Sequence, residues 1–290
     1  VLSLGRQDIP RKANLYNWVK PRRPIPPNRI VEVTERVAAG GAVLETLDEF
    51  SVHEAADALL ELDVEAVAVC LLHAFANPAH ESRVATILRE RLPGVAVTTS
   101  TDVLPVVREY ERTVASVLNA IVMPGVTTYV GRIEERLAAE GVTAPLLLMQ
   151  SNGGVAGAAK IRQAPALTAL SGPAAGVVGA LAEAQACGIE DIVTVDIGGT
   201  SADICLIAGG VIGLTQSGQV GEWPLPLPMV DMITIGAGGG SIAVVADGTL
   251  SVGPRSAGAA PGPAAYNQGG TEPTVTDAHV VLGHLPARLL

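Results

Sequence analysis

Lysine and aromatic residues are scarce in this chain of 290 residues. Lysine occurs only at positions 12, 20 and 160, and the net charge is −10, so no predicted face carries a basic stripe. Because nucleic acids are bound mainly through cationic side chains, we expect no nucleic-acid partner. Aromatic residues make up 3% of the chain and hydrophobic residues 48%, so alanine, valine, leucine and isoleucine must form the core. A charged fraction of 17% argues against a disordered chain.

Cysteine is also rare, and the three cysteines, Cys70, Cys187 and Cys205, lie far apart in apolar segments. An odd number of widely spaced cysteines does not make a disulfide framework, so we predict small buried thiols in a reducing compartment. No signal peptide and no apolar run of membrane-spanning length are found, which predicts a cytoplasmic protein without a membrane partner. The sequence starts at Val1 without methionine and ends at Leu290, and we expect it to be part of a longer protein.

Two common nucleotide-binding motifs are absent. No segment matches the P-loop pattern GxxxxGK[ST], which excludes a P-loop. The segment 236–241, GAGGGS, departs from the dinucleotide pattern because Ser241 replaces its third glycine and a strand is predicted to follow. The glycines of this segment could form a flexible turn, or could let a flat ligand such as a purine lie against bare backbone. They are Gly236, Gly238, Gly239 and Gly240.

The chain does contain an acidic, glycine-rich segment at 193–207, VTVDIGGTSADICLI. An apolar strand is predicted to end at Asp196, and a second strand to start at Asp203. The turn between them holds Gly198, Gly199, Thr200 and Ser201. Glycines let backbone N–H groups converge on an anion, hydroxyls add donors, and carboxylates can hold a divalent cation or orient a water. A hairpin with a glycine turn would explain the glycines alone, but the acids and hydroxyls together favour a nucleotide-phosphate site.

The first half of the chain alternates strands and helices. Residues 64–72 form an apolar run typical of a buried strand, 79–92 have helical spacing, and 95–99 form another strand. This order predicts an α/β domain with some parallel pairing. Residues 109–123 follow as a long helix, which Pro124-Gly125 is predicted to stop before helix continues over 126–140.

The second half places polar glycine loops after strands. A strand at 145–149 leads into the loop 150–154, QSNGG, at the edge where open α/β sheets bind ligands. A helix of small residues runs to Ala186, ahead of the acidic hairpin. The last fifty residues are rich in glycine and proline and are predicted to be irregular, apart from a short helix 277–282 capped by Thr276.

These segments together resemble the hydantoinase/oxoprolinase family, specifically the A-type subunit of ATP-dependent hydantoinases. The resemblance covers nearly the whole chain in family order. It is carried by GRQDIPRKANLY, AVCLLHAFANPAHE, REYERTVASVLNA, LLLMQSNGGV, LSGPAAGVVGA, DIGGTSADICLI, MVDMITIGAGGGSIA and GGTEPTVTDAHVVLG.

The resemblance implies part of an actin, sugar-kinase and heat-shock-chaperone ATPase fold, with ribonuclease H-like α/β domains that close on ATP. It divides the chain into 1–105, the remainder of the N-terminal domain, and 106–290, the hydantoinase A ATPase-like core. DIGGTSAD would be the second phosphate loop and GAGGGS the adenosine-side loop. The family's first phosphate loop would lie upstream of Val1, and family members often carry histidine where Ile233 stands.

The implied activity is ATP-driven opening of a cyclic amide, a hydantoin or 5-oxoproline, by phosphoryl transfer to the amide oxygen. Asp196 and Asp203 are the implied catalytic residues: Asp196 would orient Mg²⁺ or its water, and Asp203 would either bind the metal or support a group that does. Gly198, Gly199, Thr200 and Ser201 would bind phosphate. Ser151, Asn152, Gly153 and Asp231 are candidates for substrate contact. We expect a B-type partner subunit and an oligomer.

Two alternatives stay open. The chain could belong to an ATP-dependent ketone carboxylase, in which phosphoryl transfer activates bicarbonate or an enol. It could also be a non-catalytic ATP-binding fragment, because half of the phosphate clamp would be missing from it.

Overall fold

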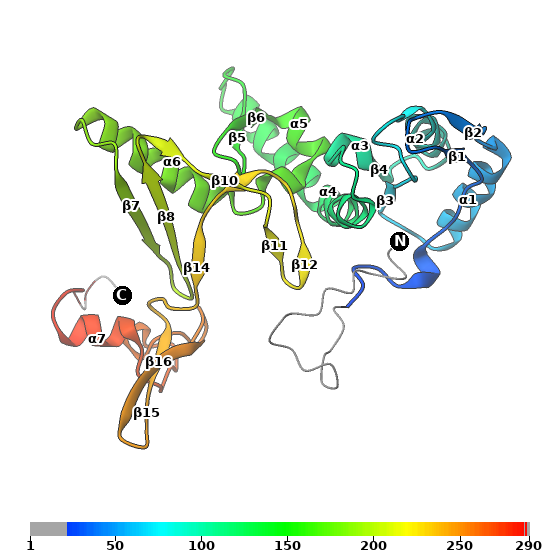
Figure 1. The fold of residues 1–290 in the computed structure, drawn as a ribbon. Coiled ribbons are helices and arrows are strands. Elements are labelled where there is room, and N and C mark those ends of the chain that lie inside the picture. The colour runs from blue at the N-terminus through cyan, green and yellow to red at the C-terminus, as the bar shows by residue number, and fades with distance from the viewer. Residues whose placement is uncertain (1–21, 287, 289–290) are drawn as a thin grey trace. The chain divides into compact units, whose positions relative to one another are not determined.

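The structure is a computed structural model that describes residues 22–286 and 288, and these form two compact units. Unit 1 comprises the described residues up to Ser171 together with Thr215–Met229, and unit 2 comprises Gly172–Leu214 and the described residues from Val230 onwards. Both units mix helices and strands, which confirms an α/β protein (Figure 1). Compact units and sequence domains are different divisions, so the domain limits 1–105 and 106–290 stay a prediction. The segment GRQDIPRKANLY lies outside the described residues.

Unit 1 contains most of the helices. Its elements are η1 (Pro27–Arg29), β1 (Arg36–Val37), β2 (Val43–Glu45), α1 (Glu49–Glu61), β3 (Ala66–Val69), α2 (Ala79–Arg91), β4 (Ala96–Thr99), α3 (Ser100–Val103), α4 (Glu109–Ala139), β5 (Leu147–Met149), β6 (Val155–Gly157), α5 (Ala158–Gln163), η2 (Pro165–Thr168), β11 (Gln219–Val220) and β12 (Trp223–Pro224). The short strands β10 (Leu214–Thr215) and β13 (Met229–Val230) lie where the chain passes between the units.

The centre of unit 1 is the parallel pair β3 and β4, which confirms the predicted parallel pairing. Helices α1 and α2 cover one face, where Val69 and Val97 pack with Val52 and Leu88 in one core cluster. Helix α4 covers the other face, and Ala68 packs against its cluster. Buried aliphatic residues on both faces explain why the sequence of β3 is apolar throughout, whereas β4 ends in two buried threonines, Thr98 and Thr99.

Helix α4 runs unbroken over 31 residues, so the predicted stop at Pro124-Gly125 is wrong. Proline removes one helical hydrogen bond, but the residues on either side are anchored, since Val114 and Val130 are fully buried. The Thr128 hydroxyl donates to the Pro124 carbonyl at 3.0 Å. The prediction gave the local proline signal more weight than tertiary packing, and packing decides here.

The unbroken α4 is also long and apolar enough to cross a membrane, and it is the one such helix among the described residues. The sequence prediction that no segment reaches that length is therefore wrong for α4. Half of its most apolar 18-residue window, 50%, is buried inside the structure, and a core helix of a soluble protein passes the same test. The absence of a membrane partner stays a prediction.

The largest sheet of unit 2 has four antiparallel strands. Its elements are α6 (Ser171–Ala186), which begins at the unit boundary, β7 (Ile192–Ile197), β8 (Ala202–Ala208), β9 (Val211–Ile212), β14 (Ile233–Ile235), β15 (Ser241–Ala246), β16 (Thr249–Ser256), η3 (Ala264–Tyr266) and α7 (Val275–Val281). The sheet order is β14-β8-β7, and β9 pairs with the far end of β8. The two predicted strands around the DIGGTSAD turn are confirmed as the β7–β8 hairpin.

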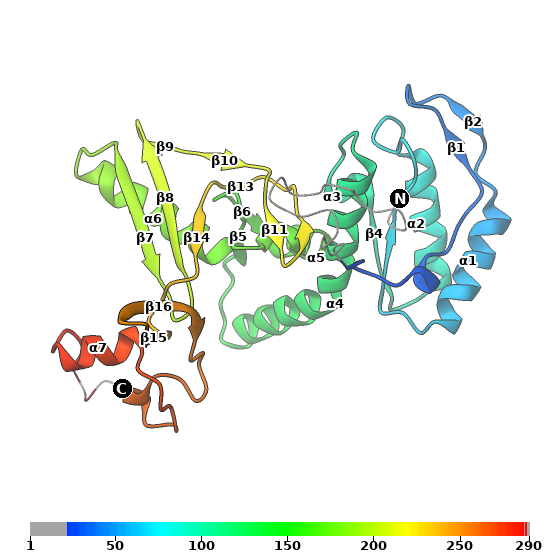
Figure 2. The same cartoon turned by 60° about the horizontal axis from the view of Figure 1, so that its bottom comes forward.

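Helix α6 covers one face of this sheet, beside β7 and β8 in both views (Figures 1 and 2). Ala174 and Val177 of the helix pack with Cys205 and Ile207 of β8 in one buried cluster. Residues two apart on a strand share a face, so Asp203 lies on this same face, beyond the apolar cluster. The arrangement places the Asp203 carboxylate next to the apolar cluster between α6 and β8.

The chain after β14 is more regular than predicted. Strands β15 and β16 form an antiparallel hairpin, so the expectation of irregular structure is wrong over Thr249–Ser256. Helix α7 is capped by Thr274 and not by Thr276, and a reciprocal capping box with Asp277 fixes this start. The predicted cap lies two residues after the observed one. The Thr276 hydroxyl does not cap the helix, because it donates to the Gly239 carbonyl.

The three thiols are free, and only part of the cysteine prediction holds. Cys205 is buried and Cys70 half-buried, whereas Cys187 is exposed at the end of α6. Burial and the nearby Glu81 carboxylate raise the pKa of the Cys70 thiol to about 12, against a smaller opposing effect of hydrogen bonds and Arg112. Cys70 is therefore protonated at neutral pH.

Candidate functional site

Asp196 and Asp203 lie directly opposite each other on the β7–β8 hairpin. Their side chains share one face of the sheet, because opposite residues of an antiparallel pair do so. Thr234 of β14 is the next residue across, and its hydroxyl donates to Asp203 Oδ1 at 2.5 Å. We call this pair of opposite residues, Asp196 and Asp203, the acidic rung. Two carboxylates at such positions repel each other unless a cation or a proton lies between them. The rung therefore has the charge and the oxygen ligands that suit a divalent cation.

The turn that joins these strands is closed by one backbone bond, from Gly198 N–H to the Ser201 carbonyl at 2.8 Å. Gly199 and Thr200 at its tip are exposed. A Cβ built on Gly199 would meet no atom within 4 Å, so that side of the residue is open to approach, whereas its carbonyl accepts a bond from Gly240 N–H. This matches what a phosphate-binding turn requires.

The second glycine segment, 236–240, lies against this turn. Gly239 N–H donates to the Gly198 carbonyl at 2.9 Å, and Gly240 N–H donates to the Gly199 carbonyl at 2.6 Å. A Cβ on Gly238 would lie 2.6 Å from the Gly198 carbonyl oxygen, and a Cβ on Gly240 would lie 2.9 Å from that of Gly199. Glycine is needed at both positions because the two loops touch backbone to backbone.

The sequence left two roles open for segment 236–240, a flexible turn or a platform for a flat ligand. The structure adds a third role, which is to pack backbone to backbone against the turn 198–201. Gly238 and Gly240 are buried, whereas Gly236 remains exposed with open space at its Cα. The adenosine-side role of Gly236, Gly238, Gly239 and Gly240 stays a prediction.

Thr276 fixes the glycine segment from the side of α7. Its N–H and its hydroxyl both donate to the Gly239 carbonyl, at 2.8 and 2.9 Å. On the opposite side Gly238 N–H donates to Ser241 Oγ at 2.9 Å. The sequence does not predict either residue as a loop support: its pattern assigns Thr276 to a helix cap, and Ser241 stands out only as a departure from the dinucleotide motif.

A cavity of about 470 Å³ adjoins the acidic rung. Asp196 and Asp203 line it together with Pro173 and Gly176 from the first turns of α6 and with Met232. Its volume lies in the range of small-molecule sites. The described residues contain no group of three histidine, cysteine or acidic side chains that could hold a metal ion by themselves. Mg²⁺ suits such a site, because it is commonly held by one or two carboxylates plus water and phosphate oxygens.

The loop 150–154 belongs to unit 1. Ser151 is buried, and its hydroxyl donates to the carbonyls of Leu167 at 2.7 Å and Ala169 at 2.5 Å. Asn152 is exposed, and its side-chain oxygen accepts from Gly154 N–H at 2.9 Å. Ser151 thus stabilises the loop from inside and is not available to a substrate. Of the candidates for substrate contact in this loop, Asn152 and Gly153 remain accessible. Asp231 of unit 2 is exposed.

Two family models match the sequence. The hydantoinase/oxoprolinase model matches residues 112–290, and the model of the N-terminal region of hydantoinase/oxoprolinase matches residues 1–92. The chain belongs to the hydantoinase/oxoprolinase family. The family expected from the quoted segments is confirmed.

Individual members of the family are similar over nearly the whole chain. Caprolactamase subunit alpha of Pseudomonas jessenii is 42% identical over 251 residues, covering 86% of this chain and 36% of that protein. The acetophenone carboxylase gamma subunit of Aromatoleum aromaticum is 38% identical over 288 residues, covering 96% of this chain and 39% of that protein.

Solved structures agree with this. The crystal structure of ATP-dependent caprolactamase from Pseudomonas jessenii aligns with a TM-score of 0.81 at 38% identity, covering 98% of this chain and 41% of that chain. Nucleotide-free acetone carboxylase aligns with a TM-score of 0.70 at 31% identity, covering 87% of this chain and 36% of that one. This hydantoinase/oxoprolinase chain thus spans about two fifths of these relatives' length.

Proposed function

We propose that this chain is the nucleotide-binding part of an ATP-dependent enzyme that opens cyclic amides, and that its units are partial domains of the actin-like ATPase type. The observation that supports this most directly is the pair of opposed carboxylates, which line a cavity at the end of a hairpin whose turn is glycine- and hydroxyl-rich. Family membership supplies the reaction class, since relatives include an ATP-dependent caprolactamase and 5-oxoprolinases.

In this proposal the β7–β8 turn binds the phosphates of ATP. The exposed backbone at Gly199 and the hydroxyls of Thr200 and Ser201 contact phosphate oxygens, with Gly198 shaping the turn. Asp196 holds Mg²⁺ or a water bound to it, and Asp203 is the second acid, oriented by the Thr234 hydroxyl. A bound Mg²⁺ would neutralise charge on the phosphates during transfer.

The chemistry follows from the stability of amides. A ring amide resists hydrolysis because its nitrogen lone pair is delocalised. Transfer of the γ-phosphoryl group to the amide oxygen breaks its bond to ADP, which leaves, and makes an imidate-type phosphate. Water then adds at the amide carbon, the C–N bond breaks as the ring nitrogen takes up a proton, and the remaining acyl phosphate is hydrolysed to a carboxylate and inorganic phosphate. ATP cleavage is thereby coupled to ring opening. Catalysis by this chain is then mainly positioning and charge neutralisation. A B-type subunit would be the partner; several relatives are themselves named as subunits.

A ketone carboxylase is the second candidate, and a specific comparison favours it. The acetophenone carboxylase gamma subunit matches 96% of this chain, compared with 86% for caprolactamase subunit alpha, although its identity is lower, 38% against 42%. The same phosphate site would then activate bicarbonate or an enol.

The test is an ATPase screen of the intact protein with its partner subunit. Phosphate release is measured with hydantoins, 5-oxoproline and lactams, and in parallel with ketones plus bicarbonate. We expect at least one cyclic amide to stimulate ATP cleavage and to be recovered ring-opened. Stimulation by ketone and bicarbonate alone would establish the carboxylase instead, and a complex that cleaves ATP with neither class would refute both.

A further inference from the structure

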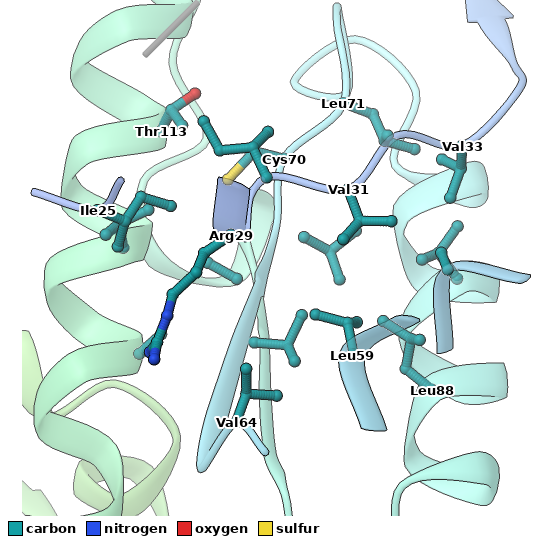
Figure 3. A pocket seen from close by; sticks show the side chains of 18 of the residues that line it. Ile25, Arg29, Val31, Val33, Leu59, Val64, Cys70, Leu71, Leu88 and Thr113 are labelled. Carbon is teal, nitrogen blue, oxygen red and sulfur yellow. The ribbon is translucent and has the colours of Figure 1, made fainter. Parts of the chain in front are cut away.

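The chain that follows β3 is held by two buried charged side chains. The Leu71 N–H donates to Glu81 Oε1 at 2.8 Å, and the Leu71 carbonyl accepts from Arg112 Nη2 at 2.6 Å. Glu81 is fully buried and Arg112 is 1% exposed. Figure 3 shows Leu71 with Cys70 and Thr113 at one end of a pocket of about 860 Å³. Burial of charged groups carries a desolvation cost, so two such contacts on one residue indicate that the backbone path after β3 is closely controlled.

His73 follows two residues later, in a conformation that residues other than glycine avoid. Its φ is +57°, in the left-handed region. Its carbonyl accepts from the N–H groups of Ala76 and Asn77, at 2.9 and 3.3 Å, which closes a turn. This turn lies past the carboxyl end of a parallel strand, the edge at which open α/β sheets bind ligands. Residues held in such strained conformations gather at functional sites, so the geometry favours a functional role for His73.

The His73 imidazole is positioned by an aromatic ring and faces a carboxylate. It meets the Phe75 ring edge-on, with centroids 6.2 Å apart and an interplanar angle of 73°, and the Arg112 guanidinium lies 5.8 Å from the Phe75 centroid. His73 Nδ1 is buried, makes no hydrogen bond within residues 22–286, and lies 3.6 Å from Glu109 Oε1. Catalytic hydrogen bonds are often this long without substrate. The His73 side chain is 29% exposed, so a small molecule can reach it.

His80 of α2 provides a comparison within unit 1. Its Nδ1 lies 2.7 Å from Glu35 Oε2, a normal hydrogen-bond distance, and the two side chains are 13% and 5% exposed. A histidine with a structural role is paired and covered in this way. His73 is more exposed and its carboxylate neighbour is beyond hydrogen-bond distance, so its imidazole can exchange a proton with a ligand.

We propose that His73 is the general base that deprotonates the ring amide, an inference that rests on the proposed function. A neutral imidate phosphate forms only if the amide nitrogen loses its proton. As the amide oxygen attacks the γ-phosphorus and the bond to ADP breaks, the N–H proton passes to His73 Nε2, and the N–H bonding pair becomes part of the new C=N bond. The proton on the imidazole is then available to the ring nitrogen when the C–N bond breaks.

Glu109 is the positioning residue of this pair. Its carboxylate faces Nδ1, which leaves Nε2 to the substrate, and it stabilises the imidazolium that forms. The proposal also narrows the substrate class to cyclic amides that carry a hydrogen on the amide nitrogen.

The first test replaces His73 in the intact protein with its partner subunit, assayed with the cyclic amide that best stimulates ATP cleavage. His73→Gly should lower substrate-dependent phosphate release by about 100-fold or more, and added imidazole should restore part of it. The melting temperature should not fall, because glycine adopts a φ of +57° without strain. Asp63→Gly is the matched control, since Asp63 is exposed with a φ of 48°, and its turnover should equal that of the wild type with or without imidazole.

Two further variants separate proton transfer from positioning of the loop. Asparagine also tolerates a positive φ but cannot accept the proton, so His73→Asn should lose as much turnover as His73→Gly, even if the glycine variant is unstable. Glu109→Gln alone should lower turnover by about tenfold or more, and should have no further effect in the His73→Gly protein, because it acts through the imidazole.

Wild-type turnover in a folded His73 variant would overturn the inference. So would a loss that imidazole does not restore and that adds to the loss from Glu109→Gln, since His73 would then only shape the loop. Equal stimulation of ATP cleavage by the same amide methylated on its ring nitrogen would also contradict it. A wild-type protein that opens no cyclic amide would overturn the proposed function itself, so the two failures are distinguishable.

Discussion

At the scale of single residues, the acidic rung is the most informative feature. Asp196 and Asp203 lie opposite each other, and the Thr234 hydroxyl donates to Asp203. Among residues 22–286, no basic side chain forms an ion pair with either carboxylate. Like charges on opposite residues of two strands do not stabilise a hairpin. The acidic rung therefore fits the proposed role of binding a cation together with the phosphates of ATP.

We predict that Asp196→Asn, in the intact protein with its partner, lowers substrate-dependent ATP cleavage by about 100-fold or more without unfolding the protein. The reason is loss of a negative oxygen ligand at constant size. Phosphate-release assays beside thermal melts measure the two effects separately.

Asp247→Asn is the matched control, since Asp247 is exposed in the turn between β15 and β16, where asparagine tolerates its positive φ of 50°. Wild-type turnover in a folded Asp196→Asn protein would refute the assignment.

The glycines of segment 236–240 give a second test at this scale. Gly238→Ala should destabilise the protein by about 1–3 kcal/mol, because its Cβ would fall 2.6 Å from the Gly198 carbonyl oxygen. Gly236→Ala should change stability by less than about 0.5 kcal/mol, since nothing lies within 4 Å of that position. Chemical denaturation of both variants measures the difference, and equal values would show that the loops do not touch.

At the scale of elements, unit 1 depends on one buried amide. Asn119 of α4 is fully buried and donates to Thr98 Oγ1 at 3.2 Å and to the Gln163 carbonyl at 3.1 Å. Its side-chain oxygen accepts from Ala166 N–H at 3.0 Å. One side chain thus joins β4, the end of α5 and η2 to α4.

Asn119→Ala should therefore cost about 3 kcal/mol, because it leaves buried donors and acceptors unpaired. The exposed Asn152 provides the control, and Asn152→Ala should cost less than about 1 kcal/mol. Urea denaturation is the measurement, and a small effect at Asn119 would mean that water replaces the amide.

The elements also show what sequence patterns can predict. The β7–β8 hairpin, helix α2 and the parallel pairing of β3 with β4 follow from apolar periodicity and turn residues, which are local signals. The continuity of α4 through Pro124, and the contact of Gly238 with the Gly198 turn, depend on residues far away in the chain. For the same reason the role of Thr276 was missed, since its partner Gly239 is brought close only by the fold.

At the scale of the whole molecule, the chain covers about two fifths of its relatives, and the resemblance places a first phosphate loop outside it. We predict negligible ATPase activity for the 290-residue chain alone, because one phosphate loop cannot hold the triphosphate on both sides. Adding the upstream segment and the partner should restore substrate-dependent turnover. Steady-state phosphate release compares the two, and an ordinary enzymatic rate from the short chain would show that the second loop suffices.

The excursion of Thr215–Met229 into unit 1 has a practical consequence for dissecting the protein. Leu225, Leu227 and Met229 are buried in the same cluster as Val114 and Leu118 of α4. A fragment cut after Ser171 would lose these three side chains and expose the apolar surface they cover. To separate the two units, the segment Thr215–Met229 must therefore stay with unit 1. A circularly permuted gene, or co-expression of two fragments, would keep this segment packed in the core of unit 1.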